Sequence, residues 1–317
     1  MTVDLLQEYP LPDPPHAPVR LGAVGLGFIF QHAHGPALRF LQARGWPVEL
    51  VAVCDVNPEV LTRATTAWPG ARVYPTAAAL LAGKPLDGIL FNTWPPLSIE
   101  LYQQALGRVP GIFVEKPVAD NADAIRQLME LADQATGTRL QVGYNRRHMP
   151  CAVAFRQALQ AADMSRKVTV RFLREKRSEP HFYEDTLGHP LDFLRSCFHT
   201  VRIVAAETVP LQPGQHLRPV VRATGFCDAY PFTLESRPAA GCNLEEYTVR
   251  GAATNLCVQH PPGATAASER DATIYAQGMV HQLASFVRLA SGAEPVSSCT
   301  LADALAARRL VDASLAK

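Results

Sequence analysis

The sequence predicts an α/β protein in which a doubly wound parallel sheet is followed by an α/β domain with an open, mainly antiparallel sheet. In the first half, helical patterns separate apolar, β-branched runs that begin at Val19, Val48, Asp87, Gly111 and Arg139. Strands that are apolar on both faces and joined by helices form a parallel sheet covered on both sides. Beyond about Asn145, strand-like segments follow one another with few helical patterns between them, which is typical of antiparallel pairing.

The length of 317 residues suits about two domains of roughly 100–200 residues each. We expect the first domain to span residues 1–145 and the second to span 146–317. Within the first domain, the prolines of residues 1–18 favour an extended arm. Helices are expected at Gln31–Ala43, Pro58–Ala67, Leu97–Leu106 and Asn121–Gln134.

The second domain is expected to begin with a helix at Ala152–Ala162. Strand-like segments follow: KVTVRFLRE, VRIVAAETV, RPVVRATGF, YPFTLESR and EEYTVRGAATNLCVQ. Two helical patterns come last, at Tyr275–Ala290 and Leu301–Ala316. Thr300 is suited to be the N-cap of the second of these helices.

The overall composition excludes several classes of protein. A hydrophobic content of 48% and a charged content of 19% are those of an ordinary globular protein. The net charge of +1 gives no reason to expect a nucleic-acid or membrane partner. The sequence shows no bilayer-spanning apolar run and no secretory signal. Its seven cysteines form no C-x-x-C pair, so we expect a reducing, cytoplasmic location and no metal site.

The stretch GLGFIFQHAHGPALRF, from Gly25, ends a strand and enters a helix. Gly25 permits a tight turn, Gly27 lets a ligand approach the backbone, and the amides of Phe28 and Ile29 at the helix start suit a pyrophosphate. Phe30 stands where a third glycine usually packs helix against strand, so we expect a looser or displaced contact there. The two glycines alone leave open a strand–turn–helix that binds nothing.

The next strand, VELVAVCDVN, ends in Asp55. An acidic residue at this position accepts hydrogen bonds from the hydroxyls of the adenosine ribose. Its charge repels a 2′-phosphate, which favours NAD over NADP. The alternative is that Asp55 merely caps the following helix. Strand, loop, helix and acid together predict a Rossmann dinucleotide site.

Two further motifs carry candidate catalytic groups. In GIFVEKP, Lys116 follows Glu115 at the carboxyl end of a strand, where open α/β sheets bind ligands and a lysine can polarise a substrate oxygen. In FYEDTLGHPLDFLR, Asp185 and His189 are four residues apart and would share a helix face. Pro190 should place the helix start near Gly188, with Asp185 just outside it. Taken alone, Lys116 could be a surface charge, and Asp185 and His189 a cap and a surface residue.

These motifs, in this order, resemble the glucose–fructose oxidoreductase/inositol dehydrogenase (Gfo/Idh/MocA) family of NAD(P)-dependent oxidoreductases. The resemblance runs from about Val19 to the last residues and is densest before Pro150. The matching stretches are AVGLGFIFQHAHGPAL, VAVCDVNPE, DGILFNTWPPLSIELYQQAL, VEKP, VGYNRRHMP, DTLGH with PLDFLR, and LADALAARRLVDAS.

The resemblance implies an NAD-dependent oxidoreductase that acts on a hydroxyl or carbonyl of a sugar, cyclitol or related polyol. It implies a catalytic cluster of Lys116, Asp185 and His189. A histidine suits general acid–base chemistry, so we assign the proton to His189, the developing oxygen charge to Lys116 and substrate orientation to Asp185. Whether Lys116 or His189 moves the proton stays open.

Other positions follow from the same resemblance. Asn92, Thr93 and Trp94 match a loop that passes under the cofactor, which Glu115 and Lys116 also reach. Asn145 and Arg146, followed by Arg147, are either substrate-pocket residues or a solvated hinge cluster. Asp192 is either a residue behind the site or a helix-surface charge. The list of expected substrate contacts is Lys116, Asn145, Arg146, Asp185 and His189.

The resemblance also implies a homodimer or homotetramer formed through the second sheet, because an uncovered apolar sheet face would otherwise meet water. The pattern departs from the family at Phe30, in the missing glycine pair before Asp185, at Pro190 and in a short second domain. Two alternatives stay open: an NAD-dependent glycosidase of the same fold, and a non-catalytic NAD(P)-binding regulator.

Overall fold

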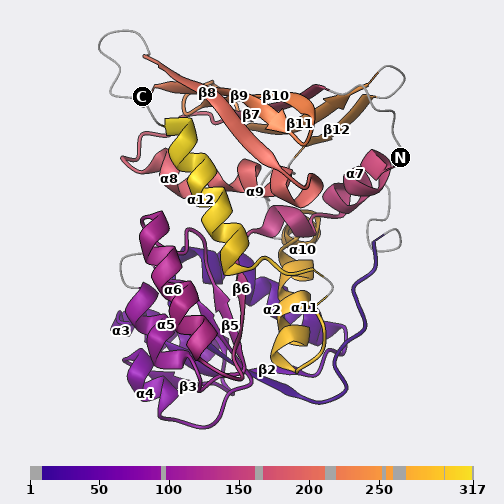
Figure 1. Ribbon diagram of the computed structural model, residues 1–317. Coiled ribbons are helices and arrows are strands. Elements are labelled where there is room, and N and C mark those ends of the chain that lie inside the picture. Colours follow the sequence, from indigo (N-terminus) through magenta and orange to yellow (C-terminus); the bar gives the residue numbers. More distant parts are fainter. Residues whose placement is uncertain are drawn as a thin grey trace. The chain divides into compact units, whose positions relative to one another are not determined.

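A computed structural model describes residues 9–93, 98–160, 167–210, 219–251, 255–259, 269–295 and 297–315 (Figure 1). The described residues form two compact units. One is drawn from Met1–Asn145 and Ala264–Ala304, and the other from Arg146–Gly263 and Leu305–Lys317. The sequence analysis also divides the chain after residue 145, but it assigns all of 146–317 to the second domain. In the structure, the segment from Ala264 to Ala304 packs instead with the first unit.

A six-stranded parallel sheet forms the centre of the first unit, in the order β3-β2-β1-β4-β5-β6. The strand order reverses between β1 and β4, and ligands of open α/β sheets bind at such a switch point. The short, mostly exposed β3 was not predicted. The strands are β1 (Val19–Val24), β2 (Val48–Cys54), β3 (Arg72–Tyr74), β4 (Gly88–Phe91), β5 (Gly111–Val114) and β6 (Arg139–Val142).

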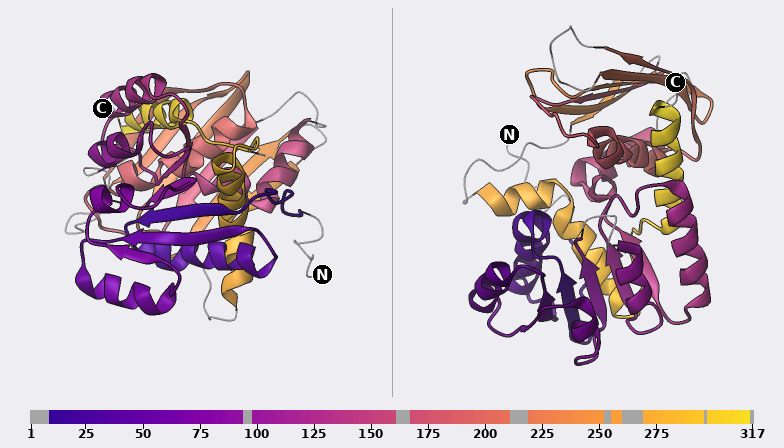
Figure 2. Two further views of the ribbon diagram at one scale, coloured as in Figure 1. Left: turned by 90° about the horizontal axis from the view of Figure 1, so that it is seen from below. Right: turned by 90° about the vertical axis from the view of Figure 1, so that its left-hand side faces the viewer.

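Helices cover both faces of this sheet (Figure 2), as the parallel arrangement requires. Every residue of β4 and β5 is buried beneath them. The helical segments are η1 (Phe30–His34), α2 (Gly35–Ala43), α3 (Pro58–Ala67), α4 (Ala77–Leu81), α5 (Ser98–Ala105), α6 (Ala122–Gln134), α10 (Arg270–Ala276) and α11 (Met279–Ala290).

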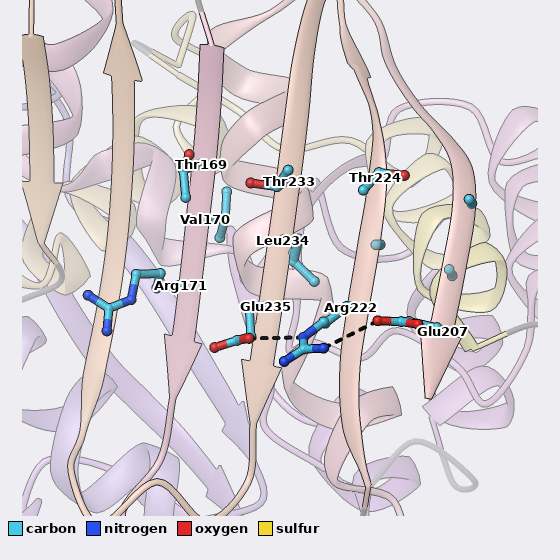
Figure 3. A pocket seen from close by; sticks show the side chains of 12 residues that line it. Thr169, Val170, Arg171, Glu207, Arg222, Thr224, Thr233, Leu234 and Glu235 are labelled. Atoms are coloured by element: carbon cyan, nitrogen blue, oxygen red, sulfur yellow. Dashed lines mark hydrogen bonds and ion pairs between the residues drawn. The ribbon is translucent and has the colours of Figure 1, made fainter. Parts of the chain in front are cut away.

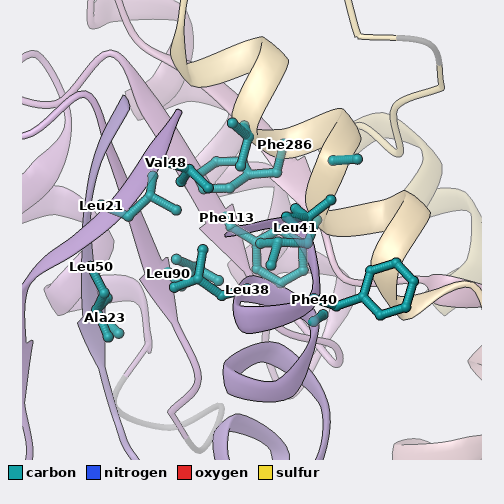
Figure 4. Packing of buried hydrophobic residues seen from close by; sticks show 14 of the residues in the cluster. Leu21, Ala23, Leu38, Phe40, Leu41, Val48, Leu50, Leu90, Phe113 and Phe286 are labelled. Atoms are coloured by element: carbon teal, nitrogen blue, oxygen red, sulfur yellow. The ribbon is translucent and has the colours of Figure 1, made fainter. Parts of the chain in front are cut away.

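Helix α11 lies directly against the strands of the first sheet. A Cβ atom built on Gly88 or on Gly111 would come within 2.9 Å of Ala290, so only glycine allows this approach. Phe286 of α11 joins Leu21 and Phe113 in the core (Figure 4). The sequence predicts one helix over Tyr275–Ala290. The structure has two, because Gly278 between them adopts a left-handed conformation with φ of 77°.

A second six-stranded sheet, in the order β12-β11-β7-β10-β9-β8, forms the centre of the other unit. Only the β7–β10 pair is parallel. The predicted fold class is thereby confirmed. The predicted segment EEYTVRGAATNLCVQ contains two strands of this sheet. The strands are β7 (Lys167–Leu173), β8 (Val201–Val209), β9 (Val220–Cys227), β10 (Tyr230–Arg237), β11 (Leu244–Arg250) and β12 (Asn255–Gln259).

The helical segments of this part of the chain are η3 (Asn145–His148), α7 (Pro150–Gln160), α8 (Phe182–Thr186), α9 (Gly188–Cys197) and α12 (Leu301–Leu315). Thr300 caps α12 as predicted, because its hydroxyl accepts from the amide of Asp303 at 3.2 Å while Asp303 accepts from the amide of Thr300. No helix among the described residues combines the length and apolar character that crossing a bilayer needs.

The two faces of the second sheet differ in chemistry. Val168 and Val170 of β7 are buried in the core, whereas Thr169 and Arg171 lie on the opposite face (Figure 3). There Arg222 donates to Glu235 at 3.1 Å and to Glu207 at 3.4 Å. The described part of this face carries threonines, small residues and exposed ion pairs.

Candidate functional site

The glycine loop after β1 has the geometry that the sequence predicts for a tight turn. Gly25 has φ of +83°, and a Cβ atom there would lie 2.8 Å from the carbonyl oxygen of Asn92. Its amide donates to the carbonyl of Cys54 at 2.9 Å. By contrast, nothing among the described residues lies within 4 Å of a Cβ built on Gly27. The space over Gly27 is therefore open to the close approach of a ligand.

The helix after this loop begins with a wide turn. The amide of Gly35 donates to the carbonyl of Phe30, five residues earlier, as in a π-helix. Phe30 is only 4% exposed, and its ring centre lies 6.1 Å from that of Trp68. A Cβ atom at Gly35 would lie 3.0 Å from the carbonyl oxygen of Phe30. Phe30 is thus buried at the start of a wide helical turn that closes on Gly35, where there is little room for a side chain.

The first turn of this helix begins with backbone amides that precede its hydrogen bonds. Gln31 donates its amide to the carbonyl of Gly27 at 3.0 Å, so the amides of Phe28 and Ile29 precede the first intrahelical hydrogen bond. Ile29 is the N-cap of the π-turn. The Phe28 side chain is 77% exposed and stacks on His32 with ring centres 4.4 Å apart. Such a helix start suits an anionic ligand group.

Asp55 lies at the end of β2, beside the loop. Its Oδ2 accepts from the amide of Leu26 at 2.7 Å, and its Oδ1 accepts from the amide of Asn57 at 2.9 Å. The N-cap of α3 is Asn57, whose side chain accepts from the amide of Glu59. The alternative that Asp55 caps this helix is therefore wrong. Each carboxylate oxygen has a further lone pair that can accept from a ribose hydroxyl.

Asn92, after β4, supplies a polar group with unused capacity. Its Nδ2 donates to the carbonyl of Gly25 at 3.1 Å. Its Oδ1 is buried and has no hydrogen-bond partner among the described residues. Buried acceptors are nearly always paired, so this oxygen fits a ligand donor. Thr93 lies beside Gly25, and Trp94 lies outside the described residues. The open loop, the carboxylate of Asp55 and this oxygen together fit a dinucleotide.

Glu115 and Lys116 follow β5 at the same edge of the sheet. Glu115 is 8% exposed, and its Oε1 lies 2.6 Å from Nε2 of His34. Its Oε2 accepts from the backbone amide of Lys116 at 3.0 Å. Lys116 is half-buried and joined to Pro117 by a cis peptide bond. These contacts of Glu115 therefore connect the EKP motif to His34, in the helical turn that follows the glycine loop.

Asp185 and His189 belong to the second unit, whereas Lys116 belongs to the first. Leu187 separates α8 from α9 with right-handed helical angles, and its carbonyl accepts from the amide of Leu191. Asp185 and His189 thus lie on successive turns of a nearly continuous helical run. Helix α9 begins at Gly188 as predicted, but Asp185 lies inside a short helix of its own. His189 is 7% exposed.

A buried ionic cluster reaches His189 through Arg146. Arg146 donates to both carboxylate oxygens of Glu245, at 3.1 and 2.9 Å, and its Nη1 lies 3.4 Å from Nε2 of His189. Glu245 also accepts from Arg174 at 3.1 Å and from the hydroxyl of Tyr247 at 2.6 Å. Burial and the neighbouring charge of Glu245 raise the pKa of Tyr247 well above its ordinary value. Burial lowers the pKa of Arg174.

The remaining predicted positions are also internal. Asp192 is fully buried and accepts from Arg147 at 2.6 and 2.8 Å. The interpretations of Asp192 as a helix-surface charge and of Arg146 and Arg147 as a solvated cluster are therefore wrong. Asn145 lies in the first unit, where its side chain donates to the carbonyl of Gln277 at 2.9 Å.

Sequence reasoning missed His34 and Glu245. Strand alternation places every second residue of β11 inside the sheet, so one member of the pair Glu245–Glu246 had to be buried. That signal was available for Glu245. For His34 the sequence signal of burial is weaker: it is a histidine among the apolar residues that lead into α2.

Comparisons with known proteins agree with this geometry. The model of the Gfo/Idh/MocA family, described as an oxidoreductase family with an NAD-binding Rossmann fold, matches residues 19–144. An inositol 2-dehydrogenase/D-chiro-inositol 3-dehydrogenase of Shouchella clausii is 31% identical over 184 residues, which are 56% of this chain and 52% of that protein. The chain therefore spans about half the length of the curated relatives it matches.

Two solved structures share the fold over nearly the whole chain. GenD2 from gentamicin A biosynthesis, solved in complex with NAD, has a TM-score of 0.78 at 21% identity, and the match covers 96% of each chain. The WlbA dehydrogenase of Bordetella pertussis, solved with NADH and UDP-GlcNAcA, has a TM-score of 0.75 at 21% identity and also covers 96% of each. At this identity the likeness shows the fold alone. The match to the family model thus covers residues 19–144, and over the rest of the chain the likeness is one of fold.

Proposed function

We propose that the protein is an NAD-dependent oxidoreductase that transfers a hydride between nicotinamide and a hydroxyl or carbonyl carbon of a sugar, cyclitol or related polyol. The observation that carries this proposal is the loop from Gly25 to Ile29, open over Gly27 and flanked by the carboxylate of Asp55. This arrangement presents amides to a pyrophosphate and a carboxylate to a ribose. The carboxylate repels a 2′-phosphate, which favours NAD over NADP.

When bound, NAD accepts or returns the hydride. The alcohol must also lose its hydroxyl proton, and we assign that proton to His189. An arginine carries only donors, so the contact with Arg146 is a hydrogen bond only when Nε2 of His189 accepts. A nitrogen in that form is the one a general base needs. Lys116 stabilises the charge that develops on the substrate oxygen, and Asp185 orients the substrate hydroxyls.

Substrate contacts are proposed for Lys116, Asn145, Arg146, Asp185 and His189. Arg146 is held in place by Glu245 on two of its nitrogens, so its position is fixed before substrate arrives. The side-chain amide of Asn145 donates within the first unit, so Asn145 contributes to a pocket chiefly by fixing the backbone before Arg146. Of this set, Asn145 is therefore the residue whose replacement should change substrate preference least.

The substrate class is suggested by the relatives. The names of the curated relatives specify inositols, and the WlbA structure contains a nucleotide-linked sugar acid. We propose to test inositol isomers, free hexoses and a UDP-linked uronic acid, each with NAD and with NADP, by following the absorbance of the reduced cofactor. Reduction of NAD by at least one of these alcohols is expected. Activity with NADP alone would overturn the role given to Asp55.

Accumulation of NADH in this assay distinguishes the oxidoreductase from the two alternatives, and hydrolysis of a glycoside then distinguishes these from each other. A glycosidase that uses NAD transiently would hydrolyse a glycoside without accumulating NADH. A regulator would bind NAD and turn over none of the substrates. The buried cluster of Arg146, Glu245 and His189 favours an enzyme, because buried ionisable groups, which are costly to desolvate, are concentrated at active sites. Replacing Lys116 and His189 with alanine should abolish turnover while NAD still binds.

We also propose that copies of the chain pair through the outer face of the second sheet. Arg222 lies between Glu207 and Glu235 on this face, and alternating charges can match a second copy across a two-fold axis. Light scattering of the Arg222→Glu variant tests this, since the repulsion should shift the protein toward monomers.

All seven cysteines are free thiols, which supports our proposal of a reducing, cytoplasmic location.

A further inference from the structure

A buried histidine–glutamate pair joins the helical turn after the glycine loop to the strand end that carries Lys116. Nε2 of His34 lies 2.6 Å from Oε1 of Glu115, and the two residues are 1% and 8% exposed. The other carboxylate oxygen accepts from the backbone amide of Lys116 at 3.0 Å. A carboxylate can only accept, so His34 carries a proton on Nε2 and donates it to Glu115.

The surroundings hold this pair in one arrangement. A Cβ atom on Gly143 would lie 3.0 Å from three atoms of the Glu115 carboxylate, so the carboxylate fills the space that a side chain would need. The ring of His34 packs edge-on against Phe113 with centres 5.0 Å apart. Nδ1 of His34 is buried and has no hydrogen-bond partner among the described residues. The neutral ring with its hydrogen on Nε2 therefore leaves no buried N–H unpaired.

The pair also has a direct covalent path to the glycine loop. His34 is the last residue of the π-turn that begins at Phe30, and the amide of Gly35 closes that turn on the carbonyl of Phe30. A π-turn inserts an extra residue into the helix and is often found at functional sites. The turn thus places His34 at the end of the segment that starts with Gly25, facing the carboxylate beside Lys116.

We propose that His34 and Glu115 are positioning residues that fix the backbone of Lys116 relative to the dinucleotide loop. Without the pair, the backbone amide of Lys116 loses the acceptor that Glu115 provides. The backbone that carries the lysine side chain is then no longer held in one position. Small displacements of a catalytic group cost up to about 100-fold in rate. The inference rests on the proposed function, because it takes Lys116 as a catalytic residue.

The chemistry of the pair dictates which substitutions are tolerated. Glu115→Gln keeps the shape of the side chain but replaces one carboxylate oxygen with an NH2 group, which is a donor. The side chain therefore cannot accept hydrogen bonds from both His34 and Lys116. His34→Leu removes the donor to Glu115. His34→Gln places an amide donor at similar reach, and its carbonyl takes the place of the unpaired Nδ1 acceptor. We therefore expect Glu115→Gln and His34→Leu to be impaired and His34→Gln to resemble the wild type.

A matched control exists in the same unit. His281 is a half-buried histidine whose buried Nδ1 lacks a hydrogen-bond partner among the described residues, and its Nε2 lies 3.2 Å from the carbonyl oxygen of Tyr9. His281→Gln and His281→Leu thus reproduce the substitutions at a position remote from Lys116 in the sequence and outside the proposed site. They show how much of any effect comes from replacing a histidine that has a buried ring nitrogen.

The first measurement needs neither cofactor nor substrate: it is the hydrogen-exchange rate of the Lys116 amide in the full chain. In Glu115→Gln and His34→Leu this amide should exchange at least about tenfold faster, while core amides of β5 stay protected. His34→Gln and both His281 variants should match the wild type. Thermal unfolding shows that each variant is folded, and the isosteric Glu115→Gln covers the case in which His34→Leu does not fold.

The second measurement is NAD affinity and stoichiometry, with kcat on the alcohol found active in the panel. We expect kcat to fall up to about 100-fold in the two impaired variants while each chain still binds one NAD. The proposal would be overturned if the Lys116 amide exchanged at an unchanged rate in the two impaired variants, or if His281→Leu changed that rate equally. It would also be overturned if His34→Gln lost activity as His34→Leu does. Faster exchange with unchanged kcat would likewise overturn it. If no alcohol is oxidised, the proposed function fails, while the exchange data still decide whether the pair fixes Lys116.

Discussion

Replacing Glu245 with glutamine should destabilise the second unit far more than replacing an exposed glutamate. Glu245 is 3% exposed and neutralises Arg146 and Arg174, which are themselves largely buried. Removing one partner from a buried ion pair costs about 3–5 kcal/mol, because the remaining charge is left buried without compensation. With a urea m-value of about 2 kcal/mol/M, the midpoint of unfolding should fall by about 1.5–2.5 M.

The matched control is Glu235→Gln on the outer face of the same sheet. Glu235 pairs with Arg222 and Arg237, but its side chain is 30% exposed, so this loss should cost at most about 1 kcal/mol. All three tryptophans precede residue 145, so their fluorescence follows the first unit, whereas circular dichroism follows both. Equal midpoints for Glu245→Gln and Glu235→Gln in the dichroism curves would refute the reasoning.

Three further outcomes follow from the structure. Gly27→Ala should weaken NAD binding at least about tenfold without lowering the melting temperature, because the new methyl group enters open space. Gly25→Ala should instead lower the free energy of unfolding by about 1–3 kcal/mol, because residue 25 has φ of +83° and its Cβ would meet Asn92. Calorimetry and thermal unfolding check both, and a stable Gly25→Ala protein would contradict this account. Asp55→Asn should lower the ratio of the NADP dissociation constant to the NAD dissociation constant. An unchanged ratio would show that Asp55 does not select between the two cofactors. Burial raises the pKa of the Cys197 thiol to about 12, so at pH 8 it should stay a thiol and resist iodoacetamide while the exposed Cys242 reacts; peptide mass spectrometry measures this, and equal labelling would be the contrary result.

Much of the first sheet was predictable because its signals are local. Strands such as β4 and β5 are apolar throughout, and a strand buried on both faces must be. Strand β3 was missed because its three residues are partly or fully exposed. Helix α11 lies within the predicted helix Tyr275–Ala290, whereas most of α10 precedes it and was not predicted. An apolar stripe also shows only that a helix is buried and not which sheet it covers. Their packing against the first unit therefore required the structure.

The candidate site shows the same division. Gly25, Gly27 and Asp55 were found from strand–loop–helix spacing, since that spacing is a property of neighbouring residues. The contact between His34 and Glu115 joins residues 81 apart, and no local pattern records it. The ion pair of Arg147 with Asp192 is similar, because only the folded chain shows that Asp192 is buried. Contacts of this kind depend on tertiary packing.

Hydride transfer to NAD is the central claim, and a deuterium label tests it most directly. The protein is incubated with NAD and the active alcohol of the panel, deuterated at the carbon that bears the hydroxyl group. We expect NADH that carries one deuterium, with none in the matching Lys116→Ala, His189→Ala double variant. NADH formed without deuterium, or equal deuterium transfer by the double variant, would contradict the account.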